Sequence, residues 1–585
     1  MGVLRGTAGG RAGGAAGTHW RPAVGGMSLV VAAGLAVGGC GGSSSPGTPA
    51  CSAKPAAVGG ASAAGGPATP AAAGQAARQA RRAAAAGWSL PGGDLANTRD
   101  VASAITSSNV LQLGVAWTVP LRITSHTDGA YATTPVVVNG VVYVQDLDSN
   151  VMAISLASGK VLWRHDYNSP NGGPDGVNVA NGVVYAATNH AAVALSAATG
   201  SQLWSRTLIG NDHEGIDMTP GYNHGTVYVS TVPVNPTVGV YLGGGKATLW
   251  ALNAATGAPE WSWDEVQNLW GKPGINSGGG QWYPPSFDAQ GNVYIGVANP
   301  GPLGGVRDYP WGTSRPGPDL YTDSVVKLSP QGKLLWYYQL TPHDLFDWDL
   351  QNPPVLTTAH GQPVVIDGGK AGILIELNAQ TGKLLWKLPV GVHNGNDHDG
   401  LLTEYAKPTS HLKLPAEVCV EPGLIGGIET QLASNGATTF AAVNDLPLPM
   451  DATGRSPGSA AATIQSIFKA TGEMVAVNQD TGKAEWDAKL PSSPYGAAAV
   501  TNNVVFTTTF NGYLYALNAA TGAILLKKPL SAGTNAPVAI DGDYVIAGAG
   551  APLAKSQQPL IIAYKLGATG KLPDTVGSTE EAGNG

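Results

Sequence analysis

Residues 514–526 read LYALNAATGAILL, and the chain repeats this segment almost letter for letter. The same pattern stands in LWALNAATGAPEW at 249–261 and in LIELNAQTGKLLW at 374–386. Apolar and polar residues alternate on both sides of a Thr-Gly pair, as in two antiparallel strands joined by a tight turn in which glycine takes a positive φ. Each copy therefore predicts a β-hairpin, and most copies end on a tryptophan.

Further copies lie at 151–163, 192–204, 325–336 and 474–486. A second strand pair precedes most copies, and in TPVVVNGVVYVQD at 134–146 its Asn-Gly turn is the strongest short signal for a hairpin. Each unit therefore supplies about four strands, and repeats of this period are typical of radially or linearly stacked β architectures.

The number of repeats and their positions predict a closed ring. The last strand of each copy ends at residue 163, 204, 261, 336, 386, 486 or 526, and LGVAWTV at 113–119 is an eighth candidate without the preceding turn. After residue 526 the chain supplies only the strands NAPVAID, DYVIAGAG and PLIIAYKL, and segment 113–119 can complete their sheet. We therefore predict an all-β, eight-bladed β-propeller of four-stranded antiparallel blades, closed by an N-terminal strand so that its sheet edges are protected.

The repeated tryptophans and Thr-Gly pairs are interpreted as structural, with each tryptophan packing against the next blade. Two spacings between successive tryptophans stand out, with 75 residues between Trp261 and Trp336 and 100 between Trp386 and Trp486. Long insertions on a rigid scaffold are where binding groups usually lie. Functional residues are therefore expected near the axis, where inner strands and long connections meet.

The composition agrees with a β-rich fold and excludes some partners. Among 585 residues, Gly (82) and Pro (42) are abundant and charged residues make up 12%, which favours short strands and many turns. The formal net charge of −7 and the lack of a long Lys/Arg run predict no nucleic-acid partner. None of the three cysteines lies in a CxxCH pattern, which excludes covalently attached c-type haem, and Cys419 is interpreted as a buried or incidental thiol.

The N-terminus has the features of an export signal. The apolar run MSLVVAAGLAV at 27–37 is too short to remain as a membrane-spanning helix, and it follows Arg5, Arg11 and Arg21. The run leads into VGGC at Cys40, which resembles a bacterial lipoprotein box, and an ordinary cleaved signal is the alternative. We expect an exported, cell-surface or periplasmic lipoprotein that meets the membrane only through a lipid anchor on Cys40.

The chain is predicted to have one folded domain with low-complexity flanks. The expected parts are a signal peptide with lipobox at 1–39, a tether at 40–86, a propeller at 87–567 and a flexible tail at 568–585. The tether is rich in Gly, Ala, Pro and Ser and cannot bury a core of its own.

Three segments resemble the quinoprotein alcohol dehydrogenases, which depend on pyrroloquinoline quinone (PQQ) and include the methanol dehydrogenase-like enzymes. They are GWSLPGGDLANTR at 87–99, the segment 314–349 and, within it, TPHDLFD at 341–347. The resemblance covers most of the chain after the tether. It implies oxidation of a small-molecule alcohol or sugar hydroxyl outside the cytoplasm, by hydride transfer to a non-covalent quinone. Electrons would then pass to an external acceptor.

The resemblance implies roles for four residues. Asp347 would be the catalytic base, since alcohol oxidation requires removal of the hydroxyl proton, and it would share in binding a metal. Lys370, in DGGKAGILIELN, would donate a hydrogen bond to a quinone oxygen and stabilise the charge that develops there. Trp282 would stack on the flat quinone, and Asn299 would offer its carbonyl oxygen to Ca²⁺ or another divalent or trivalent cation.

Three positions depart from the family pattern. Segment 168–185 has no adjacent cysteines, and the family arginine that follows them falls on Asp175. The family's metal-ligating glutamate has no counterpart in STVPVNPTVG at 230–239, and Glu214 and Asp217 at the start of the same blade are candidate substitutes. These departures keep open a non-catalytic, lipid-anchored propeller that acts as a binding or assembly scaffold, or one that binds a different small molecule.

Overall fold

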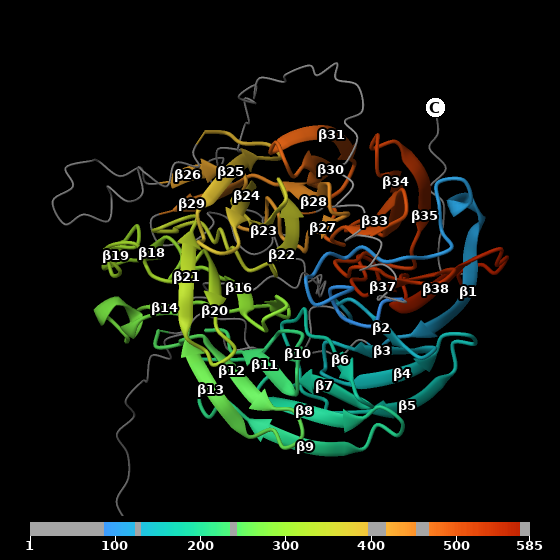
Figure 1. Cartoon of the computed structure of the whole chain (residues 1–585), viewed down its shortest axis with the longest axis horizontal. Coiled ribbons are helices and arrows are strands. Elements are labelled where there is room, and N and C mark those ends of the chain that lie inside the picture. The colour runs from blue at the N-terminus through green and yellow to red at the C-terminus, as the bar shows by residue number, and fades with distance from the viewer. Residues whose placement is uncertain are drawn as a thin grey trace, which may run out of the picture.

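The computed structural model describes residues 87–122, 130–233, 243–395, 417–451, 467 and 469–573. The strands of this part form eight four-stranded antiparallel sheets that stand around a central axis like the blades of a wheel (Figure 1). The predicted eight-bladed propeller is therefore confirmed. No helix in the described residues is long and apolar enough to cross a membrane. The predicted signal peptide, the tether and Cys40 lie outside the described residues.

The first four blades each follow chain order from the axis to the rim. Blade 1 consists of β2 (Val136–Val138), β3 (Val141–Gln145), β4 (Val151–Ser155) and β5 (Val161–His165). Blade 2 consists of β6 (Asn178–Ala180), β7 (Val183–Ala187), β8 (Ala191–Ser196) and β9 (Gln202–Thr207). Blade 3 consists of β10 (Gly221–Asn223), β11 (Thr226–Ser230), β12 (Thr248–Asn253) and β13 (Pro259–Asp264). Blade 4 consists of β15 (Ser286–Phe287), β16 (Val293–Val297), β20 (Ser324–Leu328) and β21 (Leu334–Gln339).

The other four blades complete the circle. Blade 5 consists of β22 (Val355–Ala359), β23 (Gln362–Gly368), β24 (Ile373–Asn378) and β25 (Leu384–Pro389). Blade 6 consists of β27 (Ala433–Ser434), β28 (Thr438–Asp445), β30 (Thr471–Asn478) and β31 (Lys483–Leu490). Blade 7 consists of β32 (Ala499–Thr501), β33 (Val504–Thr509), β34 (Tyr513–Asn518) and β35 (Ile524–Pro529). Blade 8 consists of β36 (Ala539–Asp541), β37 (Tyr544–Ala549), β38 (Leu560–Leu566) and β1 (Leu113–Pro120).

Three short strand pairs and two 3₁₀ turns of the described residues lie outside the eight blade sheets. The pairs are β14 (Ser277–Gly278) with β17 (Pro300–Gly301), β18 (Gly305–Val306) with β19 (Tyr309–Pro310), and β26 (Glu417–Val420) with β29 (Leu448–Asp451). The 3₁₀ turns are η1 (Val110–Gln112) and η2 (Asn268–Gly271). Cys419, in β26, is disulfide-bonded. Its interpretation as a buried or incidental thiol is therefore wrong, because cysteine spacing in a sequence does not show which segments the fold brings together.

The ring closes as expected through the N-terminal strand. β1 is the outermost strand of blade 8 and pairs with β38 from Leu113↔Leu566 to Pro120↔Leu560. The first described strand therefore lies beside the last one, as the adjoining blue and red strands of Figure 1 show. This pairing gives blade 8 its fourth strand, so the edge of β38 is paired and the blade is complete.

Seven of the eight seams between blades repeat one contact, which explains the recurring letters of the repeat. At Trp386 the indole Nε1 donates to the carbonyl oxygen of Gln479 in the next blade at 2.9 Å. Gly482 of that blade has a φ of +62°, and a Cβ there would lie 2.6 Å from Trp386 Cγ. The same indole-to-carbonyl bond joins Trp117 to Leu156, Trp163 to Ala197, Trp204 to Ala254, Trp261 to Pro330, Trp336 to Ala379 and Trp486 to Ala519. The tryptophans and the Thr-Gly pairs are thus structural, as predicted.

A glycine substitution measures the strength of one seam. Gly482→Ala places a methyl group into the Trp386 ring, whereas Gly182→Ala puts one into open space at a similar φ of +77°. We expect Gly482→Ala to lower the free energy of unfolding by about 1–3 kcal/mol more than Gly182→Ala, because only the former adds a steric clash to the backbone strain. Urea unfolding followed by tryptophan fluorescence compares the two variants. Equal losses would show that the indole face does not require a glycine.

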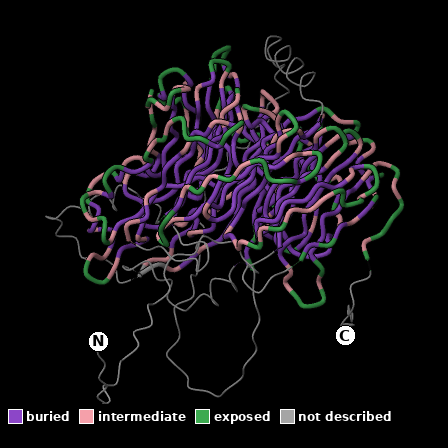
Figure 2. The backbone as a smooth tube through the Cα atoms, turned by 90° about the horizontal axis from the view of Figure 1, so that it is seen from below, coloured by how far each residue is buried: buried purple, intermediate pink, exposed green. Residues whose placement is uncertain are grey.

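Chain direction places the predicted site residues on one face of the wheel. Successive hairpins of an antiparallel blade point to opposite faces, so the Thr-Gly turns lie on one face. The turn between the second and third strands and the connection to the next blade lie on the other, here called the site face. Lys370 and Asn299 follow second strands (β23 and β16), and Asp347 and Trp282 lie in blade-to-blade connections. The strands beneath these segments are largely buried, while exposed residues gather in turns and connections (Figure 2).

Candidate active site

The proposed base and the proposed cation are in direct contact. Lys370 Nζ lies 2.8 Å from Asp347 Oδ2 and 2.5 Å from Asp349 Oδ2. All three side chains are buried, so their charges are screened far less than they would be in water. Asp347, Asp349 and Lys370 therefore form one electrostatic unit built from two neighbouring loops.

Trp282 and Asn299 join the same cluster. Lys370 Nζ lies 4.7 Å from the centroid of the Trp282 ring, which is within the range of a cation–π contact. The backbone N–H of Asn299 donates to Asp349 Oδ1 at 2.7 Å. The structure thus brings together all four residues selected from the sequence, and Asp349 is the link between Asn299 and Lys370. We call these five residues the quinone cluster.

Asp347 has an unusual backbone conformation that its neighbours support. Its φ is 65°, in the left-handed region that residues other than glycine rarely occupy. The carboxylate of Asp344 accepts the backbone N–H of Phe346 and the backbone N–H of Trp348, each at 2.7 Å. These bonds hold the chain on both sides of Asp347 and offset a strain of about 1–3 kcal/mol.

Burial governs the protonation of these groups. Burial raises the pKa of Asp347 to about 7, with Lys370 opposing the increase and Asp349 adding to it. Burial also disfavours the charge on Lys370, but Asp347, Asp349 and Glu429 hold the pKa of its ammonium well above the usual value. Burial likewise raises the pKa of Glu429, whose Oε1 lies 4.0 Å from Lys370 Nζ, to about 8. At neutral pH Asp347 is thus poised between its two forms beside a charged lysine, which suits a general base.

Comparison with known proteins finds relatives of this chain. A family model described as glucose/ethanol/alcohol dehydrogenase, beta-propeller domain, matches residues 88–188 and 242–417. The quinohemoprotein alcohol dehydrogenase of Comamonas testosteroni is 28% identical, over 79% of this chain and 71% of that protein. The chain is a homologue of the PQQ-dependent alcohol dehydrogenases. The putative dehydrogenase XoxF of Paracoccus denitrificans is also 28% identical, over 76% of this chain and 83% of that protein.

Solved structures agree with this assignment at the level of the fold. The quinohemoprotein alcohol dehydrogenase ADH-IIG of Pseudomonas putida superposes with a TM-score of 0.70 at 22% identity, over 86% of this chain and 83% of that one. A second family model, outer membrane protein assembly factor BamB, matches residues 148–278 and 447–564. The resemblance found in the sequence is confirmed, and the named homologues support an oxidoreductase of the PQQ-dependent alcohol dehydrogenase type.

This quinoprotein dehydrogenase homologue has a buried acid, Glu265, that the sequence analysis missed. Glu265 directly follows β13, and its Oε1 accepts hydrogen bonds from Ser230 Oγ at 2.6 Å and Gln281 Nε2 at 2.7 Å. Its Oε2 accepts the N–H of Gly280 at 2.7 Å. Burial raises its pKa to about 7, and these donors oppose the increase. Glu265 therefore holds the segment that leads into Trp282, next to the position where the family's glutamate is missing.

Glu265→Gln tests this supporting role. A glutamine keeps the size of the side chain, but its NH₂ group would face donors that now point at a carboxylate. We expect the free energy of unfolding to fall by about 1–3 kcal/mol, the cost of a buried donor left without an acceptor. The matched control is Glu260→Gln in β13, where an exposed carboxylate accepts bonds from Thr226 Oγ1 and Asn253 Nδ2, and a change within about 0.5 kcal/mol is expected. Urea unfolding measures the free energy of unfolding of both variants. Equal losses in Glu265→Gln and Glu260→Gln would contradict the role of Glu265 in holding the segment before Trp282.

The remaining predicted acids differ in their relation to the quinone cluster, and Asp217 lies near enough to Asp349 for that carboxylate to raise its pKa. Asp175 and Asp217 are fully buried, and the backbone N–H of Asp175 donates to the carbonyl oxygen of Asp217 at 3.1 Å. Within the described part of the chain neither carboxyl group has a hydrogen-bond partner. Burial raises the pKa of both carboxyls well above the usual value, and Asp217 adds to the increase at Asp175. Glu214 is half-buried, and its Oε1 accepts the N–H of Lys246 at 3.1 Å.

Proposed function

We propose that this protein oxidises the hydroxyl group of a small alcohol or sugar with non-covalent PQQ, outside the cytoplasm. The observation that carries the proposal is the buried contact between Asp347 and Lys370, made against the face of Trp282. A carboxylate held ready to take a proton, a fixed cation and an aromatic platform are what hydroxyl oxidation by a planar quinone requires. The homologues named as quinone-dependent alcohol dehydrogenases support the same reaction.

The residues of the quinone cluster suit a planar cofactor. Trp282 offers a ring face for stacking, and Lys370 places a positive charge with N–H donors over that face. Gln281 Oε1 and Glu429 Oε2 are buried and have no hydrogen-bond partners within the described residues. Buried polar atoms of this kind are usually satisfied by a ligand, water or ion. PQQ would thus be held by Trp282, Lys370 and Gln281.

Oxygen donors for a hard cation are also present in the cluster. Asp347, Asp349 and Asn299 supply carboxylate and amide oxygens, the ligand types that Ca²⁺ prefers. No group of three or more His, Cys, Asp or Glu side chains is arranged to hold a metal among the residues described. We propose that Asp347, Asp349 and Asn299 would hold Ca²⁺ or another divalent or trivalent cation, and that this cation would add positive charge beside the bound quinone.

In the proposed reaction, Asp347, Lys370 and Trp282 each have a defined role. The quinone, when bound, supplies the two-electron acceptor for the hydride of the alcohol carbon. Asp347 accepts the hydroxyl proton on a carboxylate oxygen, and it can do so only in its ionised form. Lys370 favours that form, since its charge lowers the pKa of Asp347. Trp282 orients the ring system, and burial of the cluster excludes water and strengthens each electrostatic contact.

Electron transfer and location complete the proposal. The 585 residues contain no CxxCH pattern, so the electrons are proposed to leave through an external acceptor. We propose that the signal at 1–39 exports the protein and that a lipid on Cys40 attaches it to the membrane, which places the reaction at the cell surface or in the periplasm.

A binding titration tests the proposed function. Purified protein is titrated with PQQ in the presence of Ca²⁺ or La³⁺, and quenching of tryptophan fluorescence is followed. Saturable binding of one PQQ, together with dye-linked oxidation of an alcohol or sugar, is the expected result. Absence of binding with every cation contradicts the proposal and favours the scaffold alternative, for which chemical cross-linking would then identify a partner.

A further inference from the structure

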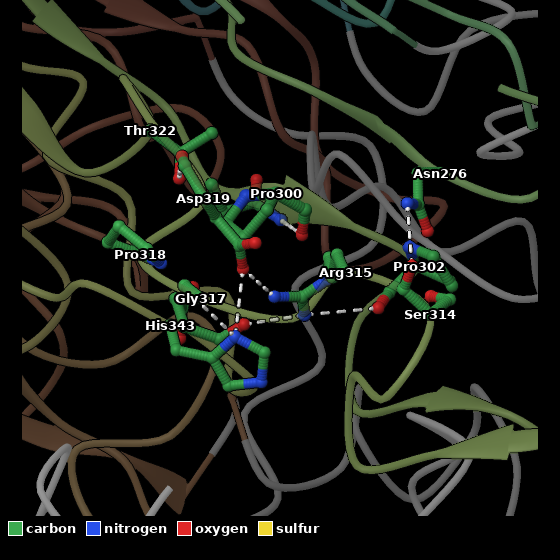
Figure 3. A network of polar contacts seen from close by, with 12 residues as sticks. Asn276, Pro300, Pro302, Ser314, Arg315, Gly317, Pro318, Asp319, Thr322 and His343 are labelled. Atoms are coloured by element: carbon green, nitrogen blue, oxygen red, sulfur yellow. Dashed lines mark hydrogen bonds and ion pairs between the residues drawn. The ribbon is translucent and has the colours of Figure 1, made fainter. Parts of the chain in front are cut away.

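A buried network of charged side chains adjoins the Asp347 loop from the long insertion of blade 4. Arg315 and Asp319 lie in the connection between β19 and β20, and His343 lies shortly after β21. The side chains of all three residues are 0% exposed. Figure 3 shows the guanidinium group of Arg315 and the ring of His343 both directed at the carboxylate of Asp319. None of the three residues belongs to the quinone cluster.

Arg315 joins the insertion to the loop 343–349. Its Nη1 forms an ion pair with Asp319 Oδ2, and the same carboxylate oxygen lies 3.1 Å from His343 Nδ1. Its Nη2 donates to the carbonyl oxygen of Asp344 at 2.6 Å. A planar guanidinium can hold both partners at once because its donors form a rigid fork. The carbonyl of Asp344 is therefore fixed by a residue that is itself held in place.

Asp344 is the residue that supports the backbone of Asp347. While Arg315 holds its carbonyl, its carboxylate accepts the backbone N–H groups of Phe346 and Trp348. Asp347 lies between these two amides with a φ of 65°. A backbone in that region persists only where surrounding contacts over-determine it. The direction of the Asp347 carboxylate toward Lys370 thus depends on a chain of contacts that ends at Arg315.

Stability alone gives little reason to bury this network. The desolvation of two charges largely offsets their attraction, and an apolar set of similar volume is often as stable. An apolar set could not, however, hold a backbone carbonyl at a fixed position. The contact that distinguishes Arg315 from a purely structural ion pair is its bond to Asp344.

We propose that Arg315 is a positioning residue for Asp347, which acts through Asp344 to hold the loop 343–349 in the conformation that directs Asp347 at Lys370. The catalytic consequence of this inference rests on the proposed function, whereas the structural consequence does not. The two can therefore be tested separately on the full chain.

Hydrogen–deuterium exchange tests the structural consequence. In the unsubstituted protein the amides of Phe346 and Trp348 should exchange as slowly as those of β16. Arg315→Lys keeps the charge but loses the fork, so these two amides should exchange at least about 10-fold faster while β16 is unchanged. The matched control is Arg206→Gln, because Arg206 Nε also donates to a backbone carbonyl, that of Gly257, across a blade seam at 2.8 Å. This control should leave both amides unchanged.

Kinetics with the PQQ-loaded protein test the catalytic consequence. If the Asp347 carboxylate is displaced in Arg315→Lys, kcat should fall by about 10–100-fold. The affinity for PQQ should stay within about three-fold of that of the unsubstituted protein. A merely structural role would lower thermal stability and leave kcat per bound PQQ unchanged.

Three results would overturn the inference. They are fast exchange of the two amides in the unsubstituted protein, unchanged exchange in both Arg315→Lys and Arg315→Gln, and unchanged kcat in a variant whose exchange has increased. If the unsubstituted protein neither binds PQQ nor oxidises alcohols, the proposed function fails, and the exchange measurement still decides whether Arg315 holds the loop.

Discussion

The Asp347→Asn variant is expected to keep its PQQ and to lose alcohol oxidation. Asparagine has nearly the same shape and still offers an oxygen to Lys370 Nζ, which lies 2.8 Å from the carboxylate in the unsubstituted protein. An amide cannot take up the hydroxyl proton at neutral pH, and loss of a general base lowers kcat by about 10²–10⁴-fold. Dye-linked oxidation of primary alcohols, expressed as kcat per bound PQQ, measures the effect.

The other face of the wheel offers a matched control for this variant. Asp288 Oδ2 lies 3.5 Å from Lys327 Nζ, which lies 4.8 Å from the centroid of the Tyr294 ring. This trio repeats the combination of acid, lysine and ring, but Asp288 stands in the hairpin between β15 and β16, opposite the site face. Asp288→Asn should change kcat by less than about two-fold. Similar activity in the two variants would exclude Asp347 as the base.

The Lys370→Met variant is expected to lose activity at neutral pH and to recover part of it at higher pH. Removing the ammonium removes a fixed charge that stabilises the developing anion, an effect of about 10²–10³-fold in kcat. It also removes the charge that lowers the pKa of Asp347, which is about 7 in the presence of Lys370. Since only ionised Asp347 can act as the base, kcat/KM should rise with pH in both proteins, and its acid limb should lie at a higher pH in the variant than in the unsubstituted protein.

A pH profile of kcat/KM separates these two effects of Lys370. Lys327→Met is the control, because it removes a lysine that also lies over an aromatic ring and beside an aspartate. Its profile should keep the position of the acid limb. An acid limb that stays in place or moves to lower pH in Lys370→Met would show that Lys370 does not set the protonation of Asp347.

The fold could be predicted because its signals are local. The turn of each hairpin needs a glycine at positive φ, as at Gly482 with +62°, and that requirement is visible within one copy of the repeat. The pairing of β1 with β38 followed from the strands that remain after residue 526. The contact of Trp386 with the next blade followed from the regular recurrence of tryptophan.

The candidate site could be predicted only in part. Asp347, Lys370, Trp282 and Asn299 were found through a family resemblance, and their convergence was then a prediction about geometry. Asp349 offered a signal, since it is a second carboxylate two residues after Asp347 in the same connection. Glu265 offered none, because a glutamate at the end of an outer strand resembles the exposed Glu260 of the same strand.

Strand alternation and turn chemistry act between neighbours in the chain, and for that reason the repeats alone specify a wheel of eight sheets. Burial, hydrogen bonding and pKa depend instead on which distant segments pack together. Glu265 accepts hydrogen bonds from Ser230 and Gln281, and Arg315 donates one to Asp344. These bonds form only when the fold packs the connecting segments together on one face. The poised state of Asp347 arises from that crowding, since the carboxyl loses water while Lys370 approaches from another loop.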